Sequence, residues 1–126
     1  MEQLASALSS FYGDLNGSQA NSLSKRVTIV VMTEFGRRLR ENANKGTDHG
    51  HGGVMMLLGD HVIGGKVYGQ WPGLRTDQLY ERADLAVTTD FRQVLAEVVI
   101  KRLKNNKIGA VFPDFKNFVP LHILQA

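Results

Sequence analysis

Two histidines and a carboxylate lie within one short glycine-rich segment, and these are the residues of this sequence best suited to chemistry. Asp48, His49 and His51 are surrounded by four glycines. In an extended segment, side chains two residues apart project from one face, so His49 and His51 could point together. Neutral imidazole and carboxylate groups are ligands that zinc, manganese or iron(II) accepts. The segment therefore predicts a metal site in which Asp48 points away or orients a ring from behind.

The same segment has a plainer interpretation. It could be a glycine-rich surface turn whose histidines only hydrogen-bond the backbone, and the spacing of two histidines does not decide between the two. The other histidines are weaker candidates. We expect His61 to be a solvent-facing turn residue and His122 to be a single packed or exposed side chain.

A carboxylate and an arginine follow the first apolar segment of the chain. Residues 27–32 are β-branched and apolar on both faces, which predicts a strand buried on both sides in a parallel sheet. Ligands of open α/β sheets bind beyond the carboxyl ends of the strands, where Glu34 and Arg37 emerge. Glu34 is either a surface carboxylate or a metal ligand facing the same pocket as His49. Arg37 is either a solvated arginine or a planar fork that binds an oxyanion.

Helices and further strands are expected to hold these groups in place. An apolar stripe predicts a helix over residues 2–15, and the short apolar run at 54–58 predicts a second buried strand. Gly64-Gly65 between β-formers predicts a β-hairpin over residues 62–68. A second helix should begin after an N-cap that Thr88, Thr89 or Asp90 could provide, and end at Asn105-Asn106.

These elements predict an α/β fold with one domain over residues 1–126. The expected architecture is a mostly parallel sheet flanked by helices, with a β-hairpin insertion. The apolar tail from Ile108 to Ala126 should dock on a core, either of this chain or of a partner.

Composition excludes several classes of protein. The chain has 126 residues, no cysteine and a net charge of +3, and its charged residues form no long run of one sign. A disulfide framework and a thiolate metal site are therefore excluded. We expect neither nucleic-acid binding nor a membrane span, whereas an anionic small molecule is a compatible ligand. These residues contain no export signal.

Several strings of residues follow one another along most of the chain: Thr28 to Arg37, Gly46 to Gly52, Gly64 to Gly69, Trp71 to Leu74, Val87 to Glu97 and Val111 to Pro113. In this order they resemble the family filed as domain of unknown function 1501. That family looks like a branch of the alkaline phosphatase and sulfatase superfamily. The resemblance implies a partial alkaline-phosphatase-like domain and hydrolysis of phosphate or sulfate esters at a metal centre.

The resemblance also assigns roles to residues. Gly46-Thr47-Asp48-His49 looks like the string that completes the metal ligands of the superfamily, so His49 is the first ligand candidate, supported by Asp48 and Thr47. Glu34-Phe35-Gly36 stands where Asp-His-Gly is usual. Glu34 can still bind a metal but Phe35 cannot, which puts a two-metal site in doubt.

A second departure concerns the nucleophile. Enzymes of the superfamily carry it in an N-terminal portion that this chain lacks, so we expect a truncated C-terminal domain. Its expected function is to supply metal ligands to a zinc- or manganese-dependent ester hydrolase. The alternative is a non-catalytic domain that binds an anion or a protein. Its partner would be a missing N-terminal half or a second copy held through the apolar tail. Relatives look exported to the periplasm.

Overall fold

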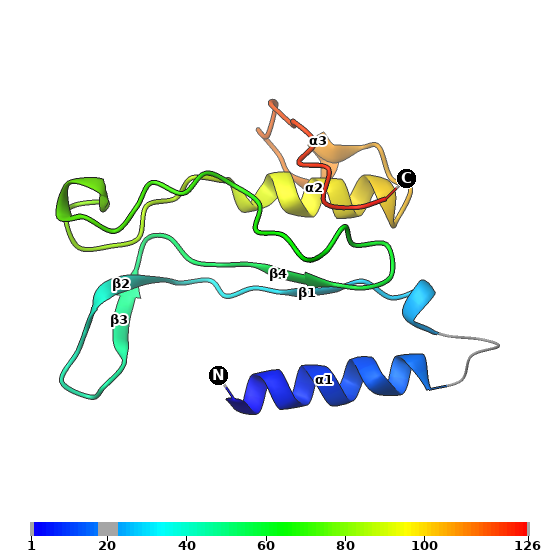
Figure 1. Cartoon of the computed structure of the whole chain (residues 1–126). Helices are drawn as coiled ribbons and strands as arrows, with labels where there is room; N and C mark the ends of the chain where they lie inside the picture. The colour runs from blue at the N-terminus through cyan, green and yellow to red at the C-terminus, as the bar shows by residue number, and fades with distance from the viewer. Residues whose placement is uncertain (1, 18–22, 126) are drawn as a thin grey trace.

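The computed structural model describes residues 2–17 and 23–125. Its elements are labelled in Figure 1, apart from the two short 3-10 helices η2 and η3. In chain order they are α1 (Glu2–Asn16), η2 (Leu23–Lys25), β1 (Ile29–Val31), β2 (Gly36–Glu41), β3 (Thr47–Gly50), β4 (Met56–Leu58), η3 (Thr76–Gln78), α2 (Phe91–Lys101) and α3 (Ile108–Val111). In the described part of the chain, every helix is too short or too polar to span a bilayer.

The predicted parallel sheet, and with it the alkaline-phosphatase-like architecture, is wrong. The strands form two separate antiparallel pairs, β1 with β4 and β2 with β3. Parallel neighbours need a long crossover, usually a helix. The residues between β1 and β4 instead form the β2–β3 ribbon, so the chain returns to β1 in the opposite direction. The apolar runs at 27–32 and 54–58 do contain strands, but an apolar run carries no information about strand direction.

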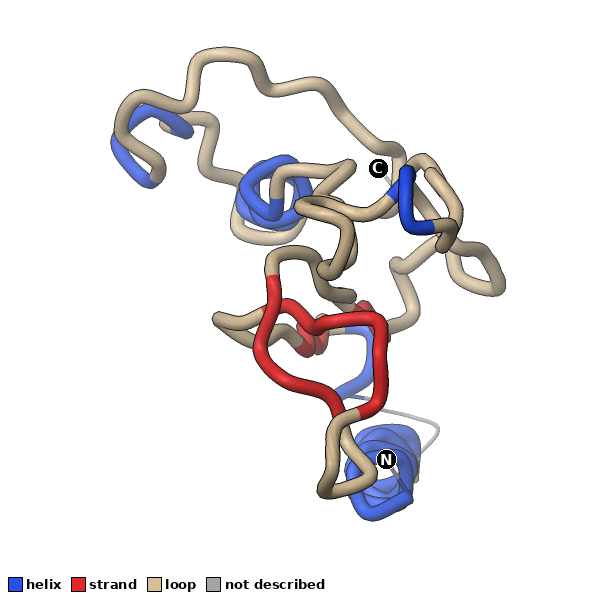
Figure 2. Tube along the Cα trace, turned by 90° about the vertical axis from the view of Figure 1, so that its left-hand side faces the viewer, coloured by secondary structure: helices blue, strands red, loops and turns tan. Residues whose placement is uncertain are grey.

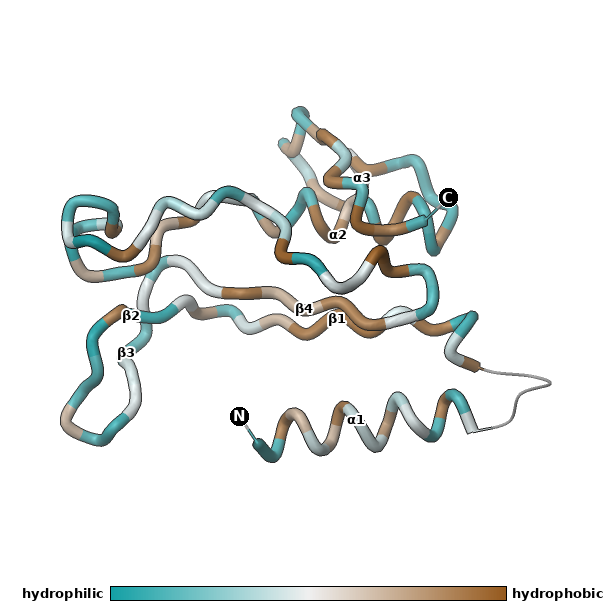
Figure 3. The backbone as a smooth tube through the Cα atoms, in the orientation of Figure 1, coloured by the Kyte–Doolittle hydropathy of each residue, from teal (hydrophilic) through white to brown (hydrophobic). Residues whose placement is uncertain are grey.

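The β1–β4 sheet lies between α1 and α2 (Figures 1 and 2). Apolar residues run along both of its strands (Figure 3). Leu57 packs on the core with α2, whereas Met56 and Leu58, which alternate with it, line a cavity beneath α1. The register pairs Ile29 with Leu58 and Val31 with Met56, so these β1 residues also face α1. The sheet therefore has apolar side chains on both faces.

The core lies between β4, α2 and the end of the chain. Val94 on α2 packs with Ile123 and Leu124 of the tail, which are 3% and 1% exposed. The half-buried side chains around them are Met55, Leu57, Val62, Tyr68, Val98 and Leu121. The prediction that the tail docks on a core is confirmed for this segment, and the core is that of this chain.

A single carboxylate holds the tail on α2. Glu97 is 1% exposed and accepts four backbone N–H groups. Its Oε2 accepts from Leu121 at 2.8 Å and His122 at 2.9 Å, and its Oε1 accepts from Ile123 at 2.8 Å and Leu124 at 3.1 Å. Lys101 Nζ lies 4.0 Å from Oε1 and donates to the Leu124 carbonyl at 2.9 Å. The buried carboxylate is therefore fully hydrogen-bonded, as burial of a charge requires.

The predicted hairpin over residues 62–68 does not form. Val62 bridges Leu124 instead, the Ile63 N–H donates to the Ile123 carbonyl, and the Gln125 N–H donates to the His61 carbonyl. The tail thus takes the backbone groups that a hairpin would have used. The Gly-Gly pattern describes only local turn preference, so it cannot show that residues 123–125, distant in sequence, will pair with residues 61–63 instead.

Of the three candidate N-caps of α2, Thr88, Thr89 and Asp90, the structure uses Asp90, which accepts from the Arg92 N–H at 2.8 Å. The Arg92 side chain also binds this carboxylate and holds the pKa of Asp90 below its ordinary value. The helix ends at Lys101, before the predicted Asn105-Asn106.

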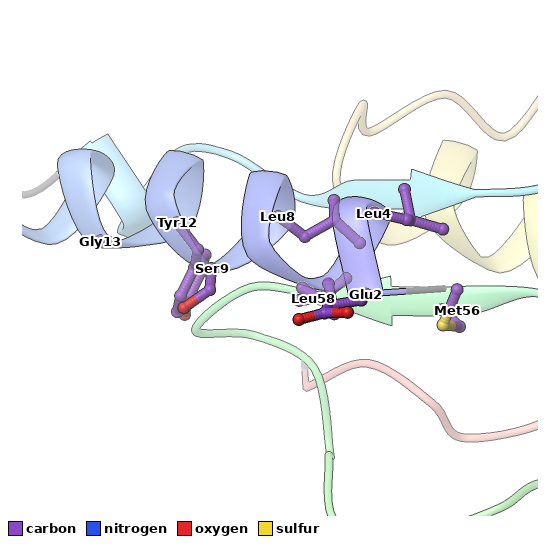
Figure 4. Close-up of a pocket in the computed structure, with 9 residues that line it drawn as sticks. Glu2, Leu4, Leu8, Ser9, Tyr12, Gly13, Met56 and Leu58 are labelled. Atoms are coloured by element: carbon purple, nitrogen blue, oxygen red, sulfur yellow. The ribbon is translucent and has the colours of Figure 1, made fainter.

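Helix α1 is attached to the rest of the chain through Asp60. Tyr12 Oη donates to Asp60 Oδ1 at 2.8 Å, and Ser24 Oγ donates to Oδ2 at 2.9 Å. Between α1 and β4 lies an apolar cavity of about 750 Å³ (Figure 4), lined mainly by Leu4, Leu8, Met56 and Leu58. No residue of α1 is fully buried in the described structure, so this polar contact matters for holding the helix.

Replacing Glu97 by Gln should destabilise the protein by about 3 kcal/mol, because the amide nitrogen cannot accept and leaves two buried N–H groups unpaired. Chemical denaturation measures the change. Glu41→Gln is the matched control, since Glu41 is exposed, and should change stability by less than about 0.5 kcal/mol. Equal effects of the two substitutions would contradict the role given to Glu97.

The attachment of α1 should depend on pH at both extremes. The hydrogen bond from Tyr12 lowers the pKa of Asp60. The stabilisation of the α1 attachment by the ionised Asp60 carboxylate is therefore present above the ordinary pKa of about 3.9 and is lost as pH falls through the lowered pKa. The same bond raises the pKa of Tyr12. The stabilisation of the α1 attachment by the protonated Tyr12 hydroxyl is therefore present below the ordinary pKa of about 10 and is lost as pH rises through the raised pKa.

Hydrogen exchange of the α1 amides across this pH range measures the effect, and Tyr12→Phe should flatten both limbs. Tyr68→Phe is the control, because the Tyr68 hydroxyl donates to the Ile63 carbonyl and not to a carboxylate. An unchanged pH profile in Tyr12→Phe would show that another contact holds α1.

Candidate anion-binding ribbon

The β2–β3 ribbon presents most of the predicted site residues. Its register pairs Gly36 with Gly50 and Arg37 with His49, with an irregularity before the Glu41–Thr47 pair. Asn42 closes the turn, since its N–H donates to the Gly46 carbonyl at 2.8 Å. Part of the glycine-rich segment runs extended, as β3 over Thr47–Gly50, but this strand belongs to a hairpin and not to a loop beyond a parallel sheet, and it ends before His51.

Backbone packing explains the density of glycine here. A Cβ on Gly36 would collide with the backbone of Gly52, and a Cβ on Gly52 would lie 2.7 Å from the Leu85 and Ala86 carbonyl oxygens. The Gly52 N–H also donates to the Leu85 carbonyl at 2.7 Å. Gly52 thus allows Leu85 and Ala86 to lie against the ribbon, and Gly36 allows the backbone of Gly52 to approach. They therefore have a structural role whether or not the ribbon binds a ligand.

Each histidine ring of the segment stacks on a different aromatic side chain. The His49 ring lies 4.2 Å from the Phe35 ring at an interplanar angle of 17°. The His51 ring lies 3.9 Å from the Tyr80 ring at 11°. These aromatic partners hold the two imidazoles in place, and both histidines remain exposed. Sequence reasoning assigned no role to Tyr80.

Arg37 and His49 are brought together directly. They are cross-strand partners, whose Cβ atoms are typically about 5 Å apart in a β-ladder. One guanidinium nitrogen of Arg37, Nη1, donates to the Thr47 carbonyl at 2.8 Å. This bond orients the exposed guanidinium and uses only one of its five N–H donors. The neighbouring Arg38 differs, because it pairs with Asp84 at 3.2 Å.

The remaining predicted ligands do not join this pair. Glu34 is exposed and makes no hydrogen bond or ion pair with any described residue. Asp48 accepts from the Asn42 amide at 2.9 Å rather than from a histidine ring. Residues 2–17 and 23–125 contain no group of three His, Cys, Asp or Glu placed to hold a metal ion. The described side chains therefore do not fit a complete metal centre by themselves.

The ribbon can thus offer one oriented guanidinium beside one imidazole, both exposed. Such a pair suits an oxyanion, because the planar guanidinium donates two parallel N–H groups. Comparison with known proteins gives a family but no activity. No curated protein and no solved structure matches this chain. Residues 1–105 match the sequence profile described as "Protein of unknown function (DUF1501)". The match covers most of the chain, which therefore belongs to the DUF1501 family.

Proposed function

We propose that the chain binds an anion through Arg37 and His49 and contributes this recognition to a phosphate- or sulfate-ester hydrolase. The cross-strand pairing of these two exposed residues carries the proposal. The Arg37 guanidinium would take two oxygens of the ester group, and its bond to the Thr47 carbonyl keeps it in position. The His49 imidazole, fixed by Phe35, would donate to a third oxygen.

The proposal limits what this chain does alone. A hydrolase of this kind would use a divalent ion, zinc or manganese, to polarise the ester. His49, Glu34 and His51 are the proposed ligands, with Asp48 and Thr47 beside them. Because the described residues do not assemble three ligands, other groups would have to complete the centre. We therefore derive no catalytic step from this chain.

A second candidate is a binding domain without catalysis. It is favoured by Phe35, whose apolar ring covers one face of the His49 imidazole where the superfamily pattern has a histidine ligand. In this case the ribbon would bind the anion without a metal. Only the hydrolase candidate requires this chain to bind a metal, whereas both candidates require it to bind an anion.

Arg37→Ala should weaken binding of inorganic phosphate and sulfate about tenfold, because the oriented guanidinium is lost. Isothermal titration calorimetry measures the affinity. The anion affinity of Arg37→Lys should lie between those of wild type and Arg37→Ala, since an ammonium group keeps the charge but not the paired N–H donors of guanidinium.

Arg40→Ala is the control, because Arg40 lies on the same strand, is exposed, and carries the same charge. Its affinity should stay within about twofold of wild type. Equal losses in the Arg37 and Arg40 variants would mean that only net charge attracts the anion, and the proposed site would be abandoned.

Zinc and manganese titrations test the hydrolase contribution. The proposal predicts only weak zinc or manganese binding by this chain, because its ligands do not complete a centre, and both His49→Ala and Glu34→Gln should weaken it further, because each removes a ligand. His61→Ala is the control, since the His61 ring contacts the Lys25 carbonyl, away from the ribbon. A wild-type chain that binds anions but no metal would favour the non-catalytic candidate.

A further inference from the structure

The β1–β4 sheet has two edges without a paired strand in the described part of the chain. It contains only two strands, so within the described residues neither strand has a neighbour on its outer side. Every second residue of such an edge points its N–H and C=O groups outward, where another strand can pair with them. This surface is independent of the β2–β3 ribbon.

The residues of β1 and its flanks carry none of the usual protection of an edge against pairing, and the nearest charged contact is that of Arg102 with Thr28, before the strand begins. Proteins blunt exposed edges with charged residues, proline or bulges. Residues 27–32 contain no charge, proline or glycine, and four of the six are β-branched aliphatic residues, Val27, Ile29, Val30 and Val31. Met32, directly after β1, is 43% exposed. The outer edge of β4 is less suitable, because Gly59 and Asp60 follow it immediately.

The chain exposes more surface than a compact monomer of its mass, and the excess is large enough for an obligate interface. The accessible surface is 9392 Å², whereas a compact monomer of 14.0 kDa exposes about 6,700 Å². The difference is about 2,700 Å², and obligate homodimers bury roughly 1,000–2,500 Å² per subunit. Exposed large apolar side chains contribute to it, including Met32 directly after β1 and Leu4 of α1, which are 43% and 40% exposed.

We propose that a second copy of this chain pairs its β1 with β1 in antiparallel register about a two-fold axis. Such a contact uses the same surface on both copies. With Val30 opposite its own copy, Ile29 lies opposite Val31, and β-branched pairs of this kind stabilise a sheet. No like charges meet, because residues 27–32 are uncharged. The product is a four-stranded sheet with α1 of both copies on one face and α2 of both copies on the other.

Sedimentation velocity of the whole chain, from micromolar to millimolar concentration, measures the association. The proposal predicts a dimer, and Met32→Lys should raise its dissociation constant at least about tenfold by placing a charge on the paired edge. Val67→Lys is the matched control, because Val67 is 99% exposed, lies outside the strands and gives the same charge change. It should leave the dimer unchanged. Circular dichroism verifies that both variants fold.

Hydrogen exchange locates the interface. Amides at 28–32 should gain protection as the protein concentration rises through the dissociation constant, whereas amides of the β2–β3 ribbon should not. A chain that stays monomeric at millimolar concentration would overturn the proposal. So would a dimer that Met32→Lys and Val67→Lys affect equally, or one whose amides at 28–32 show no change.

Discussion

The arrangement of the C-terminal third depends on the bond between the Glu97 carboxylate and four consecutive backbone amides. Removing a carboxylate from water costs several kcal/mol, so this position is stable only while the tail supplies its N–H groups. Successive amides of a strand alternate in direction and could not all reach one group. His122 has a φ of 57°, and a left-handed residue within such a segment turns neighbouring amides toward a common anion. The backbone conformation of the tail and the buried charge therefore require each other.

Local patterns predicted α1, α2 and the positions of β1 and β4, because a stripe or an apolar run is enough to specify them, whereas β2 and α3 were not predicted. The direction of the strands and the missing hairpin could not be predicted in this way, since both depend on which distant segment takes the free backbone groups. Glu97 did leave a signal. Val94, Glu97, Val98 and Lys101 have the spacing of one helix face. Glu97 is therefore a carboxylate among two valines and a lysine that can form an ion pair with it.

Sequence reasoning singled out the residues of the candidate site but did not predict how they are arranged. Arg37 and His49 were each singled out from the sequence, but their cross-strand pairing was not predicted, and it arises from a ribbon rather than from neighbouring strand ends. The rings that hold the histidines could not be read from spacing. Phe35 and Tyr80 stand far from His49 and His51 along the chain, and only the folded backbone brings them into contact. The glycines were correctly seen as sites of low bulk, yet what Gly52 lies against is the backbone of Leu85 and Ala86, and what Gly50 lies against is the backbone of Arg37 and Arg38.

The Glu97 contact also concerns where the structural domain ends. The family match stops at residue 105, which includes Glu97 but not the amides of Leu121 to Leu124 that bind it. Two of the three buried apolar residues at the core, Ile123 and Leu124, also lie beyond the match. A boundary drawn from the family profile would divide one hydrophobic core and leave its carboxylate facing apolar side chains. The cooperative unit of this protein therefore extends at least to Leu124, beyond the limit of the family match.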